Sequence, residues 1–203
     1  MPKSKEVNEH IKEERKLSIL MSALKLVSVR GYDAVRINEI AEDAGCSRGL
    51  LYHYYESKED IFHDLMEYSH QKISSFNLFD RTNKDITAKD QLIHFFDAII
   101  NILNGDLERC YFFYMFINFK YQKTLPPPPN SKKPSKPKTM RQYIEELIAQ
   151  GQKDGTILDG DPNEMTLVMY SLLRGLIFER LNTISDEYIA PKSHTIQRLL
   201  IKE

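Results

Sequence analysis

This sequence has no long apolar run, only two cysteines and a net charge close to zero. No apolar run reaches the roughly 20 residues that a membrane-spanning helix requires, and no signal peptide opens the chain. The two cysteines, Cys46 and Cys110, fall on either side of an expected domain boundary. We therefore expect no membrane span and no disulfide, and a reducing, cytoplasmic setting.

The motifs of common enzymes are also missing. The sequence contains no pairing of a nucleophile with a base, no phosphate-cradling glycine loop and no complete metal cluster. We therefore expect no catalytic activity, no cofactor and no metal. The net charge of −1 does not exclude DNA binding, because phosphate contacts need only a local cationic face.

The most informative stretch, residues 36–58, reads RINEIAEDAGCSRGLLYHYYESK. Apolar residues from Ile37 to Ala41 recur at helical spacing, and Gly45 then suits the left-handed backbone of a tight turn. Ser47 can cap the short helix that follows. Two short helices joined in this way form a helix-turn-helix, whose second helix enters a DNA major groove.

The flanking residues make this interpretation more specific. A helix is expected over 13–30, and the hydroxyl of Ser57 with the carboxylate of Asp60 can form a capping-box-like start for a further helix. The run of GYD, IAEDAG, LYHYY and SKE resembles the DNA-binding domain of the TetR family of transcriptional regulators. The resemblance implies an all-α chain, with a three-helix DNA-binding domain over 1–56 and an effector-binding and dimerisation domain over 57–203.

The resemblance also implies which residues face DNA. Carried over by position, they are Arg36, Ser47, Arg48, Gly49, Leu50, Tyr52, His53, Tyr54 and Lys58. We expect Arg48 to contact a base edge or a phosphate, and Tyr52 and His53 to hold phosphates. The family usually has a capping hydroxyl where this chain has Arg36, so we expect a lost cap and a phosphate contact by its charge. Leu51 is expected in the core.

Helical periodicity predicts the rest of the chain. The expected helices cover 57–79, 88–103, 110–121, 139–154, 163–182 and 191–201. His63, Glu67 and His70 share one face of the first of them, a spacing that could bind a transition metal. We interpret this face as a polar, solvated stripe. The segment 124–138, rich in proline and lysine, is expected to form an exposed linker.

The stretch 110–121, CYFFYMFINFKY, is apolar on all sides and should therefore be buried. Ordinary core packing is one interpretation, and a cavity for an apolar ligand is the alternative. The predicted effector pocket consists of Phe95, Phe96, Tyr111, Phe112, Met115 and Phe119.

The expected helix over 163–182 is apolar most of the way round, so it should cover two partners, its own core and a second subunit. Gly175 would allow a close approach of helices. In the TetR family the last two helices form a four-helix dimer interface, in agreement with this pattern. The predicted interface residues are Leu167, Tyr170, Ser171, Arg174, Gly175 and Phe178.

Together these features predict a homodimeric transcriptional regulator of the repressor type. It would bind a palindromic DNA operator and be released by a small-molecule effector. As an alternative, the C-terminal domain would dock a protein partner in place of a small ligand.

Overall fold

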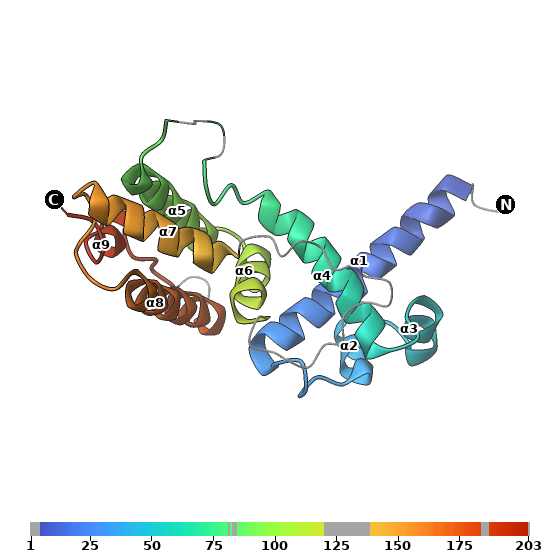
Figure 1. Ribbon diagram of the computed structural model, residues 1–203. Coiled ribbons are helices and arrows are strands. Elements are labelled where there is room, and N and C mark those ends of the chain that lie inside the picture. Colours follow the sequence, from blue (N-terminus) through green and yellow to red (C-terminus); the bar gives the residue numbers. More distant parts are fainter. Residues whose placement is uncertain (1–4, 81, 83–84, 120–138, 184–186, 203) are drawn as a thin grey trace. The chain divides into compact units, whose positions relative to one another are not determined.

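The computed structural model describes residues 5–80, 82, 85–119, 139–183 and 187–202. Over these residues the fold is all-α, as predicted, apart from one antiparallel bridge between Ile157 and Ile201 (Figure 1). In chain order the helices are α1 (Lys5–Arg30), α2 (Ile37–Asp43), α3 (Arg48–Tyr54), α4 (Lys58–Ser74), α5 (Ala88–Asn104), α6 (Leu107–Phe119), α7 (Met140–Lys153), α8 (Pro162–Asn182) and α9 (Ser193–Gln197).

The chain forms two compact units. One takes its described residues from the stretches 1–72 and 111–128, and the other from 73–110 and 129–203. Each change of unit falls inside a helix, near the end of α4 and early in α6.

The first unit is built on the apolar faces of its short helices. Its buried side chains include Leu24 of α1, Ile40 of α2, Leu51 of α3 and Phe62 of α4, none more than 1% exposed. The burial of Leu51 confirms its predicted place in the core. Burying one such side chain contributes about 1.5–3 kcal/mol, and this burial orients the opposite face of α3 toward solvent.

The second unit has its own core and clearly marked helix starts. Phe95 of α5, Ile144 of α7 and Leu173 of α8 are fully buried. Thr87 accepts a hydrogen bond from the backbone of Asp90 at 3.1 Å and thereby caps α5. Thr139 caps α7, and Pro162 occupies the first turn of α8 as expected.

Two predicted helices are too long. The helix expected over 57–79 ends at Ser74, because Asn77 has a φ of +48° that a right-handed helix cannot contain. The helix expected over 191–201 is reduced to α9, because the backbone after it pairs with another segment. Leu158 N donates to the Leu200 carbonyl at 2.7 Å, and Lys202 N donates to that of Thr156 at 3.0 Å. The proline- and lysine-rich linker lies outside the described residues.

Candidate DNA-binding interface

The turn between α2 and α3 follows the predicted geometry. Gly45 has a φ of +61°, and its N–H donates to the Glu42 carbonyl at 3.1 Å. Ser47 precedes α3, and its hydroxyl accepts a hydrogen bond from Leu50 N at 3.1 Å. This N-cap confirms the role predicted for Ser47, and it fixes where the helix expected to read DNA begins.

The outer face of α3 carries most of the predicted DNA-facing residues. Arg48, Gly49, Tyr52 and His53 are exposed, and Tyr52 keeps 51% of its surface in contact with solvent. A Cβ atom added to Gly49 would meet no other atom within 4 Å. The fold itself therefore does not require glycine at this position. The absence of a side chain at Gly49 would allow a DNA backbone to approach α3 closely.

Leu50 and Tyr54 lie closer to the edge of this face. Leu50 is 36% exposed, and Tyr54 is half-buried with its ring 5.5 Å from the ring of His53. That contact restricts the orientation of the His53 ring. Of the six predicted residues that belong to α3, four therefore point outward and two lie at the edge of the exposed face.

Arg36 precedes α2 and gives no side-chain cap, as expected from the missing hydroxyl. Glu39 partly replaces the cap from inside the helix, because its carboxylate accepts the Arg36 N–H at 2.7 Å. The same carboxylate pairs with Arg30 at 2.9 Å. The Arg36 N–H and then the Arg30 guanidinium hold the pKa of Glu39 below its usual value. Sequence reasoning did not identify Glu39.

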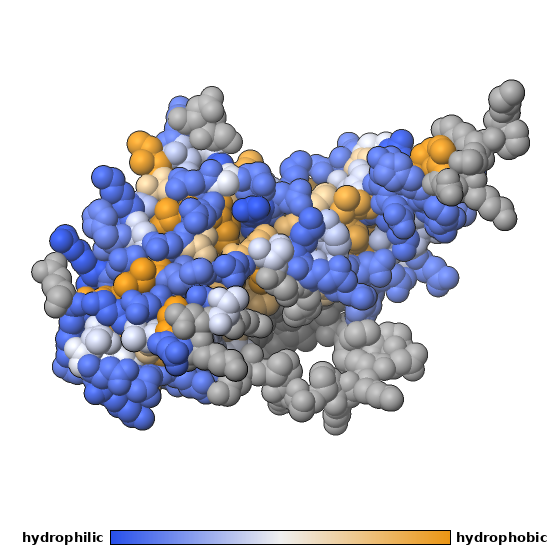
Figure 2. All heavy atoms as spheres, turned by 90° about the horizontal axis from the view of Figure 1, so that it is seen from above, coloured by the Kyte–Doolittle hydropathy of each residue, from blue (hydrophilic) through white to orange (hydrophobic). Residues whose placement is uncertain are grey.

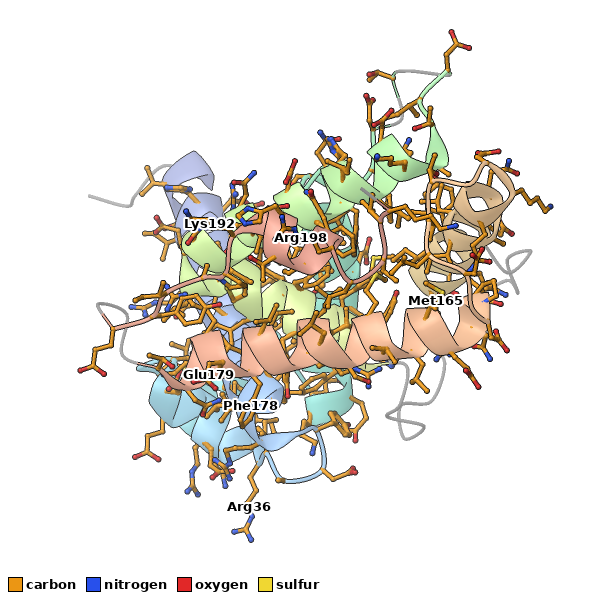
Figure 3. The ribbon with its side chains drawn as sticks, turned by 90° about the vertical axis from the view of Figure 1, so that its left-hand side faces the viewer. Arg36, Met165, Phe178, Glu179, Lys192 and Arg198 are labelled. Atoms are coloured by element: carbon orange, nitrogen blue, oxygen red, sulfur yellow. The ribbon has the colours of Figure 1, made fainter. Side chains whose placement is uncertain are left out.

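The Arg36 side chain is left free to reach outward. It is exposed, and Figure 3 shows it extending away from the ribbon. Among the described residues, no ion pair includes Arg36 or Arg48, whereas Lys25 pairs with Asp43 at 2.7 Å. An unpaired guanidinium can bind a phosphate without first losing a protein partner.

Lys58 has a different environment from the one predicted. Its ammonium donates to the backbone carbonyls of Tyr32 and Val35, both at 2.9 Å. It also lies 4.0 Å from the centre of the Tyr32 ring. Since an ammonium has three donors, two are already used on the connection between α1 and α2. Its predicted contact with DNA stays a prediction.

Tyr32 completes this joint between α4 and the connection that precedes α2. Its hydroxyl donates to the Glu59 carboxylate at 2.9 Å, and its ring meets Phe62 edge-on at 4.5 Å. Burial, followed by the bond to Glu59, raises the pKa of Tyr32. We call Tyr32, Lys58 and Glu59 the α4 clamp. It attaches the first turn of α4 to the segment that positions Arg36.

The start of α4 has the predicted cap. The Ser57 hydroxyl accepts a hydrogen bond from Asp60 N at 3.1 Å, and it donates to the Asp60 carboxylate at 2.7 Å. Further along α4, His63 is half-buried and Glu67 is exposed, while the side chain of His70 lies outside the description. Within the described part of the chain, no three histidine, cysteine or acidic side chains group as metal ligands.

α8 presents a separate outward face in the second unit. Leu167, Val168 and Phe178 are 47%, 66% and 53% exposed, and Ser171 and Gly175 lie exposed between them. The successive intervals between Val168, Ser171, Gly175 and Phe178 are three, four and three residues, which keeps these residues on one helical stripe. Figure 3 shows Phe178 near the end of this helix and Met165 near its start.

Two of the predicted interface residues do not belong to this exposed stripe. Tyr170 is 6% exposed and Arg174 is half-buried. A Cβ atom added to Gly175 would meet nothing within 4 Å, so this glycine leaves an open notch in the stripe.

Four of the six residues predicted to line an effector pocket are buried. Phe95, Phe96, Phe112 and Met115 are buried, and Tyr111 is half-buried. Phe95 stacks on Phe79 at 5.2 Å. Phe95 and Phe96 belong to the second unit, and the described predicted residues of α6 belong to the first. The side chain of Phe119 lies outside the description.

The second unit contains two cavities in other places. One, of about 230 Å³, is mainly apolar and lies among α8, α9 and Phe96 of α5. The other, of about 340 Å³, lies between the segment after α4, the middle of α5 and Arg109. Of the residues predicted to line the effector pocket, Phe96 lines the smaller of these two cavities.

The comparisons with known proteins agree with this geometry. A family described as "Bacterial regulatory proteins, tetR family" matches residues 19–65, which contain the helix-turn-helix. Residues 19–65 thus match the DNA-binding domain of this family, and the predicted resemblance is confirmed.

Curated relatives are similar to this chain over only part of its length. The fatty acid metabolism regulator protein of Bacillus subtilis (strain 168) is 29% identical over 99 residues, which make up 47% of this chain and 48% of the relative. The HTH-type transcriptional regulator AcrR of Shigella flexneri is 35% identical over 66 residues, 32% of this chain and 31% of the relative. The matched region therefore spans about half or less of these relatives.

A solved structure extends the likeness of fold to nearly the whole chain. AibR in complex with isovaleryl coenzyme A and operator DNA has a TM-score of 0.61 at 20% identity, over 91% of this chain and 94% of that one. At this identity the match establishes a shared fold.

No helix among the described residues is long and apolar enough to cross a membrane. On the face shown in Figure 2, hydrophilic residues separate the hydrophobic ones over most of the visible surface.

Proposed function

We propose that this protein is a homodimeric repressor that binds a palindromic DNA operator and releases it when a small molecule binds. The outer face of α3 carries this proposal. A capped helix that presents Arg48, Gly49 and Tyr52 to solvent fits a major groove, and the unpaired Arg36 lies ready for a phosphate. Because the relatives described above are regulatory proteins, we infer a non-catalytic protein of the cytoplasm.

The stripe on α8 supports the dimer. An exposed stripe of Val168, Ser171, Gly175 and Phe178 follows the spacing at which two helices pack. Small residues in its middle let a second helix approach closely, and the flanking apolar side chains would be removed from water. Burying the Phe178 side chain would contribute about 1.5–3 kcal/mol. A second copy of this chain has the matching stripe.

Two observations support a small-molecule effector. The second unit has cavities of about 230 and 340 Å³, and the larger one falls at the lower end of the range for small-molecule sites, about 300–1,000 Å³. AibR, which shares the fold, has been solved with isovaleryl coenzyme A and operator DNA. A docked protein partner is the alternative, and the presence of these cavities favours a small ligand.

An operator titration with two variants tests the DNA-binding half of the proposal. Arg48→Ala should weaken operator binding by about 1–3 kcal/mol and relax discrimination at one position of each half-site. Lys25→Ala, which removes a cation already paired with Asp43, is the matched control and should have a smaller effect. Unchanged operator preference in Arg48→Ala would show that this side chain does not read a base.

A further inference from the structure

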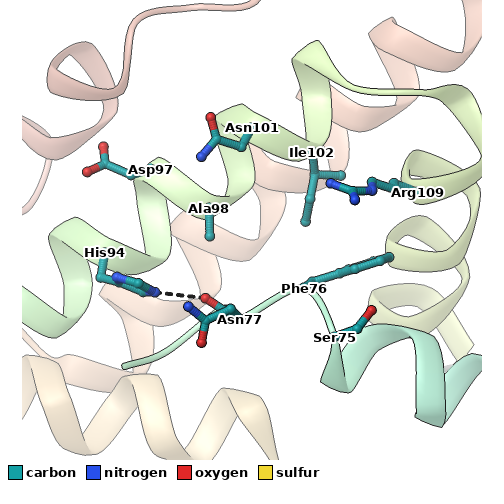
Figure 4. Close-up of a pocket in the computed structure, with 9 residues that line it drawn as sticks. All are labelled: Ser75, Phe76, Asn77, His94, Asp97, Ala98, Asn101, Ile102 and Arg109. Atoms are coloured by element: carbon teal, nitrogen blue, oxygen red, sulfur yellow. Dashed lines mark hydrogen bonds between the residues drawn. The ribbon is translucent and has the colours of Figure 1, made fainter. Parts of the chain in front are cut away.

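We propose that the 340 Å³ cavity beside α5 binds a small planar ligand with an anionic group at one end and a cationic group at the other. The assignment rests on the proposed function, which requires an effector site in this part of the chain, and it adds the location and the chemical class. The cavity is lined by Ser75, Phe76, Asn77, His94, Asp97, Ala98, Asn101, Ile102 and Arg109 (Figure 4).

One wall of this cavity is held in place by hydrogen bonds to α5. The wall is the segment 75–80, which leaves α4 through the left-handed residue Asn77. His94 Nε2 lies 2.8 Å from the Asn77 carbonyl, as Figure 4 shows. Gln91, which is buried, accepts from Asp80 N at 3.1 Å and donates to the Asp80 carbonyl. The wall is therefore formed before any ligand arrives.

Aromatic packing fixes the same wall from its other side. Phe79 stacks on Phe95 at 5.2 Å and meets Tyr143 edge-on at 4.7 Å. Phe76 lies three residues before Phe79, and its N–H donates to the Ile73 carbonyl at 3.1 Å, so the backbone that presents Phe76 to the cavity is held on both sides. A site whose walls are already ordered loses less entropy when a ligand binds.

The charges of the cavity lie at opposite ends. Asp97 and Asn101 are one helical turn apart, about 6 Å along α5, and Figure 4 shows Arg109 beyond Asn101 and away from Asp97. The Arg109 guanidinium is 3.9 Å from Asp106, a long ion pair that leaves donors available. A carboxylate suits Arg109, and an ammonium suits Asp97.

The floor between the two charges is apolar and partly flat. Arg109 lies 5.9 Å from the centre of the Phe76 ring, and Ala98 and Ile102 complete the surface (Figure 4). An aromatic ring stacked on Phe76 would place a carboxylate at the adjacent Arg109. Ala98 has a short side chain that leaves room above α5. These features favour a flat body that joins the two charged groups.

The position of the cavity suits a regulatory ligand. Its wall begins at Ser75, the residue after the last residue of α4. The first turn of α4 is attached by the α4 clamp to the segment before α2. A ligand bound against the segment 75–77 thus contacts the residues that directly follow α4, and the first turn of α4 is attached to the segment that positions Arg36.

Three probes with the same ring separate the roles of the two charges. We would measure binding of 4-(aminomethyl)benzoate, 4-methylbenzoate and benzylamine to the DNA-free, full-length protein by NMR titration. The first probe should bind about five-fold more tightly than each of the others, since a partly exposed charged contact is worth about this factor. The side-chain amide signal of Asn101 should shift on binding. Equal affinities for the three probes would overturn the assignment.

Charge-removing variants locate the contacts. Arg109→Gln should reduce binding of 4-(aminomethyl)benzoate to the level of benzylamine, and Asp97→Asn should reduce it to that of 4-methylbenzoate. Lys153→Gln and Glu108→Gln, exposed positions that do not line the cavity, should leave all three affinities unchanged. If Arg109→Gln weakened benzylamine equally, the carboxylate would not lie at Arg109. Operator affinity with and without the probe tests the proposed function separately, because the site assignment depends only on binding to the free protein.

Discussion

The α4 clamp gives a quantitative prediction for Lys58→Met, which keeps an unbranched side chain as far as its ε carbon and removes the ammonium group. The Lys58 ammonium makes two hydrogen bonds at 2.9 Å, and hydrogen bonds from charged donors contribute about 1.5–3 kcal/mol each. Its position 4.0 Å from the Tyr32 ring centre adds about 0.5–1 kcal/mol. Lys58 is only half-buried, so water can take over part of these interactions in the variant. We expect the free energy of unfolding to fall by about 2–3 kcal/mol.

Urea denaturation at one fixed protein concentration measures this loss. Arg48→Met serves as the control, because Arg48 is exposed and its replacement should change stability by less than about 0.5 kcal/mol. The salt dependence of operator binding then separates the clamp from a phosphate contact. Each phosphate contact contributes about 0.9 to the slope of log K against log salt. A clamp residue should leave this slope unchanged. Unchanged stability with a slope reduced by about 0.9 would refute the clamp and restore Lys58 as a phosphate contact.

Three further predictions concern other parts of the chain. Gly49→Ala should raise the free energy of unfolding by about 0.5–1 kcal/mol, because alanine favours a helix over glycine and the added Cβ would meet no atom. The same variant should weaken operator binding about five-fold. Thermal melts and operator titrations on one sample measure both effects. Phe178→Glu should give monomers by light scattering, whereas Ile189→Glu, at a residue 89% exposed and outside α8, should stay dimeric; a dimeric Phe178→Glu would place the interface elsewhere. Because the folded-state pKa of Glu39 lies below its ordinary value of 4.5, its stabilising contribution should be complete well above pH 4.5 and be lost as the pH falls through the folded-state value. Glu39→Gln should accordingly destabilise the protein at pH 7 but not in acid, unlike Glu42→Gln on the same helix.

The elements that sequence reasoning predicted best have local signals at their ends. Gly45 and Ser47 delimit α2 and α3, and Thr139 and Pro162 open α7 and α8, because a left-handed turn, a capping hydroxyl or a fixed φ acts within a few residues. The end of α4 lacked such a signal. Phe76 and Phe79 continue the apolar spacing of the helix, but their rings pack in a segment that has already left it.

Long-range contacts account for what the sequence could not show. Lys58 was predicted to face DNA from its position in the family pattern. The structure shows that its ammonium donates to the carbonyls of Val35 and Tyr32, which lie 23 and 26 residues earlier in the chain. No local spacing reports such a contact. The cavity beside α5 is also assembled from three segments, and its polar residues are individually ordinary. The aromatic residues of 110–121 were singled out by composition, and the structure shows that Phe112 and Phe113 are buried. A ligand contact by Phe112 stays a prediction.

The α4 clamp bears on how regulators of this kind can be recombined. The boundary predicted between residues 56 and 57 would be the natural place to join the DNA-binding domain of one protein to the ligand-binding domain of another. In this chain Tyr32 lies before that junction, while Lys58 and Glu59 lie after it. A hybrid would therefore inherit the two halves of the clamp from different parents. Its DNA-binding domain should respond to ligand only when those halves are compatible, so the clamp residues are the first positions to match when such hybrids are built.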